Sequence, residues 1–131
     1  MVGKVVEWLE GWAADKVQVA SECAELKPGR MGVFRKGAAC VQEYPDGARE
    51  EVHRFGIEIC LWAQGRTERE ENAQRVRGLE EWIREKDVAG ELPEADGECW
   101  RAEIVDGFSL KENTALESRY VGMLDLYVLR A

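Results

Sequence analysis

Residues 40–62 read CVQEYPDGAREEVHRFGIEICLW, and this stretch decides the fold because it predicts a long β-hairpin. The turn is Tyr44-Pro45-Asp46-Gly47. Proline presets φ at the second turn position, aspartate tolerates the third, and glycine accepts the left-handed geometry that ends the turn. The sequence therefore predicts a strand over Cys40–Glu43 and a return strand from about Ala48 to Ala63.

The return strand alternates between two kinds of side chain, which predicts one face on a core and one more polar face. The core face carries Phe55, Ile57, Ile59 and Leu61. The other face carries Arg54, Gly56, Glu58, Cys60 and Trp62.

A long amphipathic helix is predicted from about Glu68 to Lys86. Thr67 stands three residues before Glu70, which is the spacing of a capping box at a helix start. Val76, Leu79 and Ile83, with Ala73 and Trp82 alongside, form the apolar stripe. Arg84 and Lys86 suit the negative end of the helix dipole, and Gly90 provides a stop.

Five further elements flank these two. An amphipathic helix carries Val2, Val5, Val6, Leu9 and Trp12 at helical spacing and is finished by Ala13, Ala14 and Asp15. Short extended pieces are predicted at Lys16–Ala20 and at Met31–Phe34. Two Asp-Gly turn signals, Asp96-Gly97 and Asp106-Gly107, bracket a strand over Cys99–Val105. The last strand, Ser118–Leu129, is apolar on both faces, which is typical of a central strand.

Together these elements predict an α+β fold. Strands grouped around two helices, with tight hairpins, indicate a mainly antiparallel sheet of four to five strands packed with two helices. The chain has 131 residues, 45% hydrophobic and 34% charged, which is typical of one globular domain spanning residues 1–131.

The charge balance bears on the choice of partners. The net charge is −8 and the sequence pI is about 4.8, which argues against a protein that coats the phosphates of a duplex. Lys4, Glu7 and Glu10 interrupt the first dozen residues, so we expect no signal peptide. No apolar run approaches the length of a membrane span, and we expect a soluble protein of the bacterial cytoplasm.

The reactive side chains favour structural roles. The four cysteines, Cys23, Cys40, Cys60 and Cys99, are widely spaced and are expected to be buried free thiols in a reducing compartment. The lone His53 lies on the same strand face as Phe55 and is expected to be structural. Most of the glutamates alternate with arginines on the polar face of the long helix, as on a solvated helix surface.

No recognised catalytic pattern appears in the chain. Gly29-Arg30-Met31-Gly32 is a G-x-x-G, but Pro28 before it and the extended Val33-Phe34 after it do not fit the helix–loop–helix clamp of KH domains. There is no phosphate-binding glycine loop and no nucleophile–base pair that can be named. The expectation is a protein without enzymatic activity, cofactor or metal.

Five tryptophans exceed the need of one small core. We expect Trp12 and Trp82 to lie in the core. Large aromatic side chains anchor subunit contacts, so Trp62, Trp100 and Tyr127 are the predicted interface residues.

The order of these patterns resembles the tail terminator and minor capsid proteins of long-tailed phages and prophages of Gram-positive bacteria. The resemblance runs over most of residues 38–131. It is carried by the hairpin from Val41 to Ile59, by Leu79–Ile83, by Gly90–Pro93, by Ile104–Phe108 and by the strand opening at Arg119-Tyr120.

The resemblance implies a structural part of the virion tail or neck, assembled in the host cytoplasm. It implies a ring, generally hexameric, that caps the tail tube and joins the head connector while DNA passes through without specific binding. Since an acidic wall would repel DNA, we expect some of the surplus acids, around Glu50, Glu51 or Glu112, to face the channel.

Two alternatives stay open from the sequence. One is a head-side connector or minor capsid protein from the same gene cluster. The other is a small, non-catalytic ligand-binding α+β module, which a deep polar pocket in a stable monomer would favour.

Overall fold

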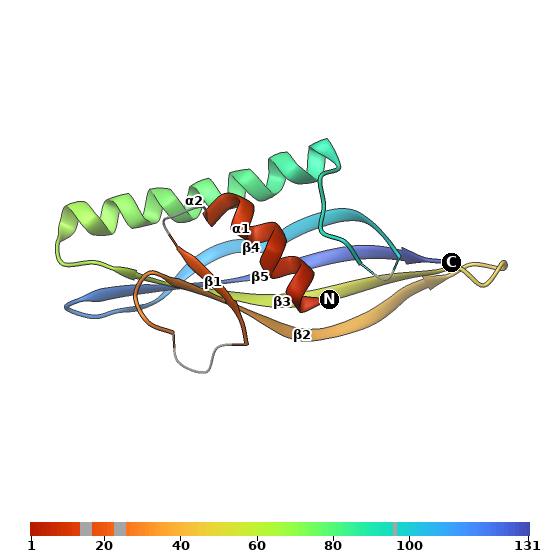
Figure 1. Ribbon diagram of the computed structural model, residues 1–131, viewed down its shortest axis with the longest axis horizontal. Coiled ribbons are helices and arrows are strands. Elements are labelled where there is room, and N and C mark those ends of the chain that lie inside the picture. The colour runs from red at the N-terminus through yellow and green to blue at the C-terminus, as the bar shows by residue number, and fades with distance from the viewer. Residues whose placement is uncertain (14–16, 23–25, 96) are drawn as a thin grey trace.

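The computed structural model describes residues 1–13, 17–22, 26–95 and 97–131. Its two helices lie on one face of a five-stranded sheet, as Figure 1 shows. The elements in chain order are α1 (Val2–Ala13), β1 (Gln18–Ser21), β2 (Arg30–Glu43), β3 (Arg49–Trp62), α2 (Arg66–Ala89), β4 (Glu98–Asn113) and β5 (Glu117–Arg130). The α+β fold with a mainly antiparallel sheet is confirmed.

Strand order explains the two-sided apolar pattern of the last strand. The order is β1-β2-β3-β5-β4, so β5 is held between β3 and β4, both antiparallel to it. The prediction of a central strand is therefore correct. Only one face of the sheet is packed under the helices, because both helices lie on that side (Figure 1).

The first helix forms as its spacing predicts. Val5, Leu9 and Ala13 are buried against the sheet. Trp8 packs on Trp82 of α2 with ring centroids 5.0 Å apart. Trp12 and Trp82, which were expected in the core, are only half-buried and pack against it. The predicted end of the helix at residues 14 and 15 lies outside the described residues.

Of the strand predicted over residues 16–20, residue 16 lies outside the described residues, and β1 begins at Gln18. It pairs in parallel with β2, from Gln18 opposite Arg30 to Ser21 opposite Val33. Parallel pairing was not predicted, because a four-residue strand carries no sequence signal for its direction.

The two extended pieces predicted on either side of Gly37 are one continuous strand, β2. It pairs with β3 along almost its whole length, with register shifts between Arg35 and Gly37 and between Cys40 and Gln42. The sequence indicated only parts of this strand, and bulges absorb its extra residues without ending the ladder.

The hairpin turn matches its prediction. The Gly47 N–H donates to the Tyr44 carbonyl at 3.0 Å, and the Tyr44 N–H donates to the Ala48 carbonyl at 2.8 Å. Gly47 has φ of 92°, in the left-handed region that glycine tolerates best. Figure 1 shows this hairpin extending beyond the helices, beside the C-terminus.

The long helix differs from prediction at its start. It begins at Arg66 after Gly65, and no side chain caps it, so Thr67 lies inside the helix and the capping box is wrong. Its end at Gly90 is confirmed, with φ of 72°. Val76, Leu79 and Ile83 are buried as predicted.

The second Asp-Gly signal is not a turn. Asp106 and Gly107 both have positive φ, at 61° and 74°, but they form a bulge inside β4, which continues to Asn113. The Glu80 side chain of α2 accepts the Phe108 N–H at 2.6 Å and so holds the bulge. The turn predicted at residues 96 and 97 falls partly outside the described residues.

The cysteines have three different environments. Cys60 is buried, Cys99 is half-buried and Cys40 is exposed, so burial was wrongly predicted for Cys40. All three are free thiols, and burial raises the pKa of Cys60 and of Cys99 to about 11. Cys23 lies outside the described residues.

Candidate assembly surfaces

The sheet face away from the helices is covered by neither helix (Figure 1). It combines ion pairs with large apolar side chains. The exposed apolar members are Trp62, Trp100 and Met123, at 54%, 48% and 37%. We call this surface the open face.

A bidentate ion pair lies at the middle of the open face. Arg54 of β3 binds Asp125 of β5 through two bonds, Nε to Oδ1 at 2.7 Å and Nη2 to Oδ2 at 2.8 Å. The carboxylate of Asp125, whose residue is only 5% exposed, raises the pKa of the guanidinium by accepting both bonds. Such planar pairs fix geometry as well as charge, so they stiffen the two central strands.

A second charged cluster surrounds Arg119. Its guanidinium lies 3.1 Å from Glu117, 3.7 Å from Glu58 and 3.9 Å from Glu112. Lys111 adds a contact of 3.6 Å to Glu58. The charges on this half of the open face are therefore largely compensated.

Two of the three predicted interface residues lie together. Trp100 of β4 and Tyr127 of β5 pack with ring centroids 5.7 Å apart, and Arg101 lies over the tyrosine ring at 5.1 Å. Arg101 also pairs with Glu103 at 2.9 Å. An exposed tryptophan beside an arginine-capped tyrosine has the composition that is enriched at protein contacts.

The third predicted interface residue lies far from this pair. Trp62 stands opposite Glu117 at one end of the β3–β5 ladder, whereas Tyr127 stands opposite Val52. Ten residues of strand separate Val52 from Trp62, which is about 33 Å at the usual rise. The sequence therefore found residues on one face but not one contiguous patch.

The three acids expected to face a channel are also distributed. Glu50 lies opposite Leu129 at one end of the sheet, and its carboxylate accepts the Tyr44 hydroxyl at 3.4 Å. Glu112 lies opposite Arg119 toward the other end and is part of the charged cluster there. Both share the open face with the aromatic residues.

Glu51 does not fit that expectation, because it points to the helix side of the sheet and is only 9% exposed. Arg130 and Arg49 lie 2.7 Å and 3.1 Å from its carboxylate. The His53 ring nitrogen lies 3.0 Å away, and this hydrogen bond is the main cause of the lowered pKa of Glu51. The acid is thus neutralised by its neighbours and contributes no open charge.

His53 is only 6% exposed. It belongs to a polar cluster with Glu51 on the helix side of the sheet. The sequence placed it on the correct strand face. Its partners could not be foreseen, because Arg130 reaches the site from the far end of the chain.

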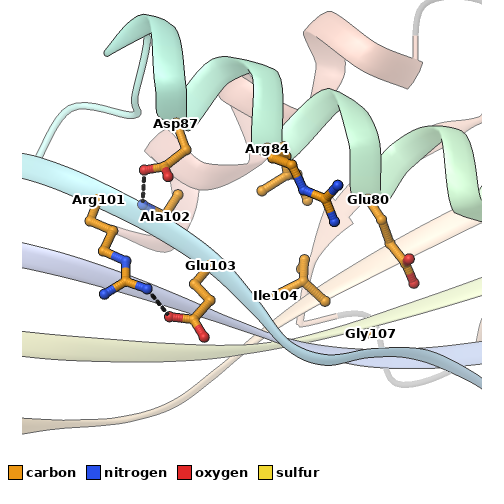
Figure 2. A pocket seen from close by; sticks show the side chains of 9 residues that line it. Glu80, Arg84, Asp87, Arg101, Ala102, Glu103, Ile104 and Gly107 are labelled. Carbon is orange, nitrogen blue, oxygen red and sulfur yellow. Dashed lines mark hydrogen bonds and ion pairs between the residues drawn. The ribbon is translucent and has the colours of Figure 1, made fainter.

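A cleft of about 330 Å³ separates α2 from β4 (Figure 2). Asp87 accepts the backbone N–H of Ala102 at 2.9 Å, and Glu80 accepts that of Phe108 farther along the strand. These carboxylates are occupied in holding β4 to the helix. Sequence analysis assigned Glu80 to a solvated helix face, since nothing distinguishes it from its acidic neighbours before β4 is in place.

Within the described ranges, no three His, Cys, Asp or Glu side chains are grouped as a metal site would need. No helix in that part of the chain is both long and apolar enough to cross a membrane.

Comparison with known proteins adds no family assignment. No protein-family model matches the chain, and no curated protein matches it either.

Proposed function

We propose that this protein is a structural tail-assembly subunit, the terminator of a long-tailed phage or prophage. In this proposal it forms a ring that caps the tail tube and joins the head connector. The observation that carries the proposal is the open face, where half-exposed tryptophans stand among ordered ion pairs. Together with the resemblance in residues 38–131, this surface favours a protein whose task is to contact other proteins.

The composition of the open face supports a contact surface. Exposed tryptophans cost little conformational entropy when they become buried, and arginine with aromatic residues is enriched where binding energy concentrates. Trp100, Tyr127 and Arg101 are already packed on one another. We propose this cluster as the main contact with the tube protein or the neighbouring subunit.

We propose a smaller set of residues for the channel wall. We keep Glu50 and Glu112 as candidates, since both lie on the open face, and withdraw Glu51 because it points to the helix side of the sheet. The ring, its subunit number, the passage of DNA and the location in the virion neck remain parts of the proposal.

The ligand-binding alternative gains little support from the cleft beside α2. Its two inward carboxylates, Glu80 and Asp87, already accept backbone N–H groups of β4. A ligand would have to displace those bonds before it could use the same oxygens.

Electron microscopy of particles from a phage or induced prophage lacking this gene tests the proposal. Overlong tails without heads are expected, because nothing would stop tube growth. Tails of normal length beside unjoined heads would instead assign the protein to the head side. Intact, infectious particles would overturn both assembly functions.

Complementation sharpens the test at the level of one residue. Trp100→Ala is expected to fold normally yet fail to restore infectious particles, because it removes an exposed anchor from the open face. Val88→Ala is the matched control, since Val88 is 84% exposed on α2, away from that face. Full rescue by Trp100→Ala would exclude the aromatic cluster as the essential contact.

A further inference from the structure

A shallow hollow of about 340 Å³ lies near the middle of the open face. Its floor comes from the two central strands, with Gly56 of β3 and with Val121 and Met123 of β5. Gly56 leaves room there because it has no side chain, and the Cε atom of Lys36 lies 2.7 Å from the place that a Cβ would take. The fold therefore leaves an apolar floor open on this face.

Two lysines stand on opposite sides of this hollow. Lys36 comes from β2 and Lys111 from β4, the two strands that flank the central pair β3 and β5. Lys36 is exposed and forms no ion pair with the described residues, whereas Lys111 has a contact of 3.6 Å to Glu58. Since Arg119 lies 3.7 Å from the same oxygen of Glu58, that one carboxylate is shared between two cations. The hollow is therefore a basic site in a chain whose net charge is −8.

The tip of the β2–β3 hairpin has the complementary composition. It extends beyond the helices in Figure 1, and its exposed residues include Glu43, Tyr44, Pro45 and Asp46. The tyrosine, which is 37% exposed, and the proline supply apolar surface at the turn. Glu43 and Asp46 stand on either side of them, and neither forms an ion pair with the described residues. The backbone bonds of Tyr44 and Gly47 fix the turn, so the tip is preorganised for a contact.

The tip and the hollow match in charge and in arrangement. The tip has an apolar centre between two acids, and the hollow has an apolar floor between two lysines. Opposite charges across a contact steer the partners together and fix their register. Because the tip and the hollow are different surfaces of one chain, a contact between them is heterologous, and its repetition from copy to copy builds a ring or a filament.

We propose that the hairpin tip of one copy of this chain inserts into the hollow of the next copy, head to tail. In this contact the Tyr44 ring lies on Met123. The Glu43 carboxylate lies beside the Lys36 ammonium. The contact joins neighbouring subunits of the proposed ring and in that sense rests on the proposed function. The aromatic cluster around Trp100 is then left for the tube protein.

A charge exchange tests the contact with the purified protein. Sedimentation velocity over a concentration series should show wild type forming species larger than a dimer as its concentration rises. Lys36→Glu and Glu43→Lys each place like charges at the contact, so each should weaken self-association by about tenfold or more. The double variant restores opposite charges and should associate to within about threefold of wild type.

Arg77→Glu is the control, because it makes the same change of charge at an exposed position of α2, away from the open face. It should leave self-association unchanged. Equal weakening by Arg77→Glu, or a double variant that associates no better than the single variants, would overturn the proposal. A wild type that stays monomeric or stops at a dimer would overturn it too. Particle morphology after gene deletion does not depend on these results, so failure of this contact and failure of the proposed function are distinguishable.

Discussion

The two edges of the sheet, along β2 and along β4, differ in how they are covered. β4 runs beside α2, and two carboxylates of the helix accept its outward N–H groups. The outer edge of β2 is paired with β1 only as far as Val33. Beyond that point no helix covers this edge among the described residues (Figure 1). A helix can therefore protect one edge of a sheet with side chains while the other edge stays available for pairing.

The largest expected effect comes from loosening the helix that protects β4. Leu79 of α2 is fully buried against the sheet. Leu79→Ala should lower the free energy of unfolding by about 2–5 kcal/mol, because the cavity removes packing as well as hydrophobic burial. Urea unfolding measures the loss, and Val88→Ala should stay within about 0.5 kcal/mol of wild type. Equal effects of the two substitutions would contradict the anchoring of α2.

A smaller effect is expected where Phe108 of β4 packs against Gly122 of β5. A Cβ on Gly122 of β5 would lie 2.7 Å from the Phe108 ring. Gly122→Ala should therefore cost about 1–3 kcal/mol by overpacking. Gly78→Ala in α2 is the matched control: its Cβ meets nothing within 4 Å, and it should stabilise the protein by about 0.5–1 kcal/mol. Thermal denaturation of both variants would show shifts of opposite sign.

Removing one carboxylate cap tests the protection of β4 directly. Asp87→Ala leaves the N–H of Ala102, a residue that is 4% exposed, without its acceptor. The expected cost is about 1–2 kcal/mol, with faster hydrogen exchange at that amide. Asp87→Asn keeps an acceptor oxygen and should recover most of the protection. Unchanged exchange in Asp87→Ala would mean that the two edges differ for another reason.

The smallest effect should arise away from both edges, at Glu51 on the central strand β3. Its lowered pKa, caused mainly by the His53 hydrogen bond, means that folding favours the ionised carboxylate. This stabilisation is fully present above the ordinary carboxyl pKa and is lost as pH falls through the lowered folded value. Acid should thus destabilise wild type more than Glu51→Gln, as urea midpoints between neutral and acidic pH would show. A parallel pH dependence in both proteins would remove Glu51 from this linkage.

The elements that sequence analysis identified correctly carry local signals. The turn at Tyr44–Gly47, the alternation from Phe55 to Leu61 and the stripe of α2 each follow from the residues within one turn or one strand face. The turn predicted at Asp106-Gly107 was wrong because this pair accepts both turn and bulge geometry. Only pairing with β5 decides between the two.

Sequence analysis predicted individual interface residues but not how they would be arranged on one surface. Trp62, Trp100 and Tyr127 do lie on one face, but only the last two are in contact. Glu51 was assigned the wrong side because strand alternation from Phe55 was not extended back to it. By that alternation it shares the core face with His53, and this signal was available in the sequence.

By itself, the sequence determined the α+β class, the hairpin, the position of α2 and the central role of the final strand, because each depends on periodicity and turn chemistry along a short stretch. Only the tertiary structure decided the order of the strands, the open face and the contrast between the two edges. Those features depend on residues distant along the chain, such as Asp87 and Ala102, whose contact requires the sheet and the helix to be packed first.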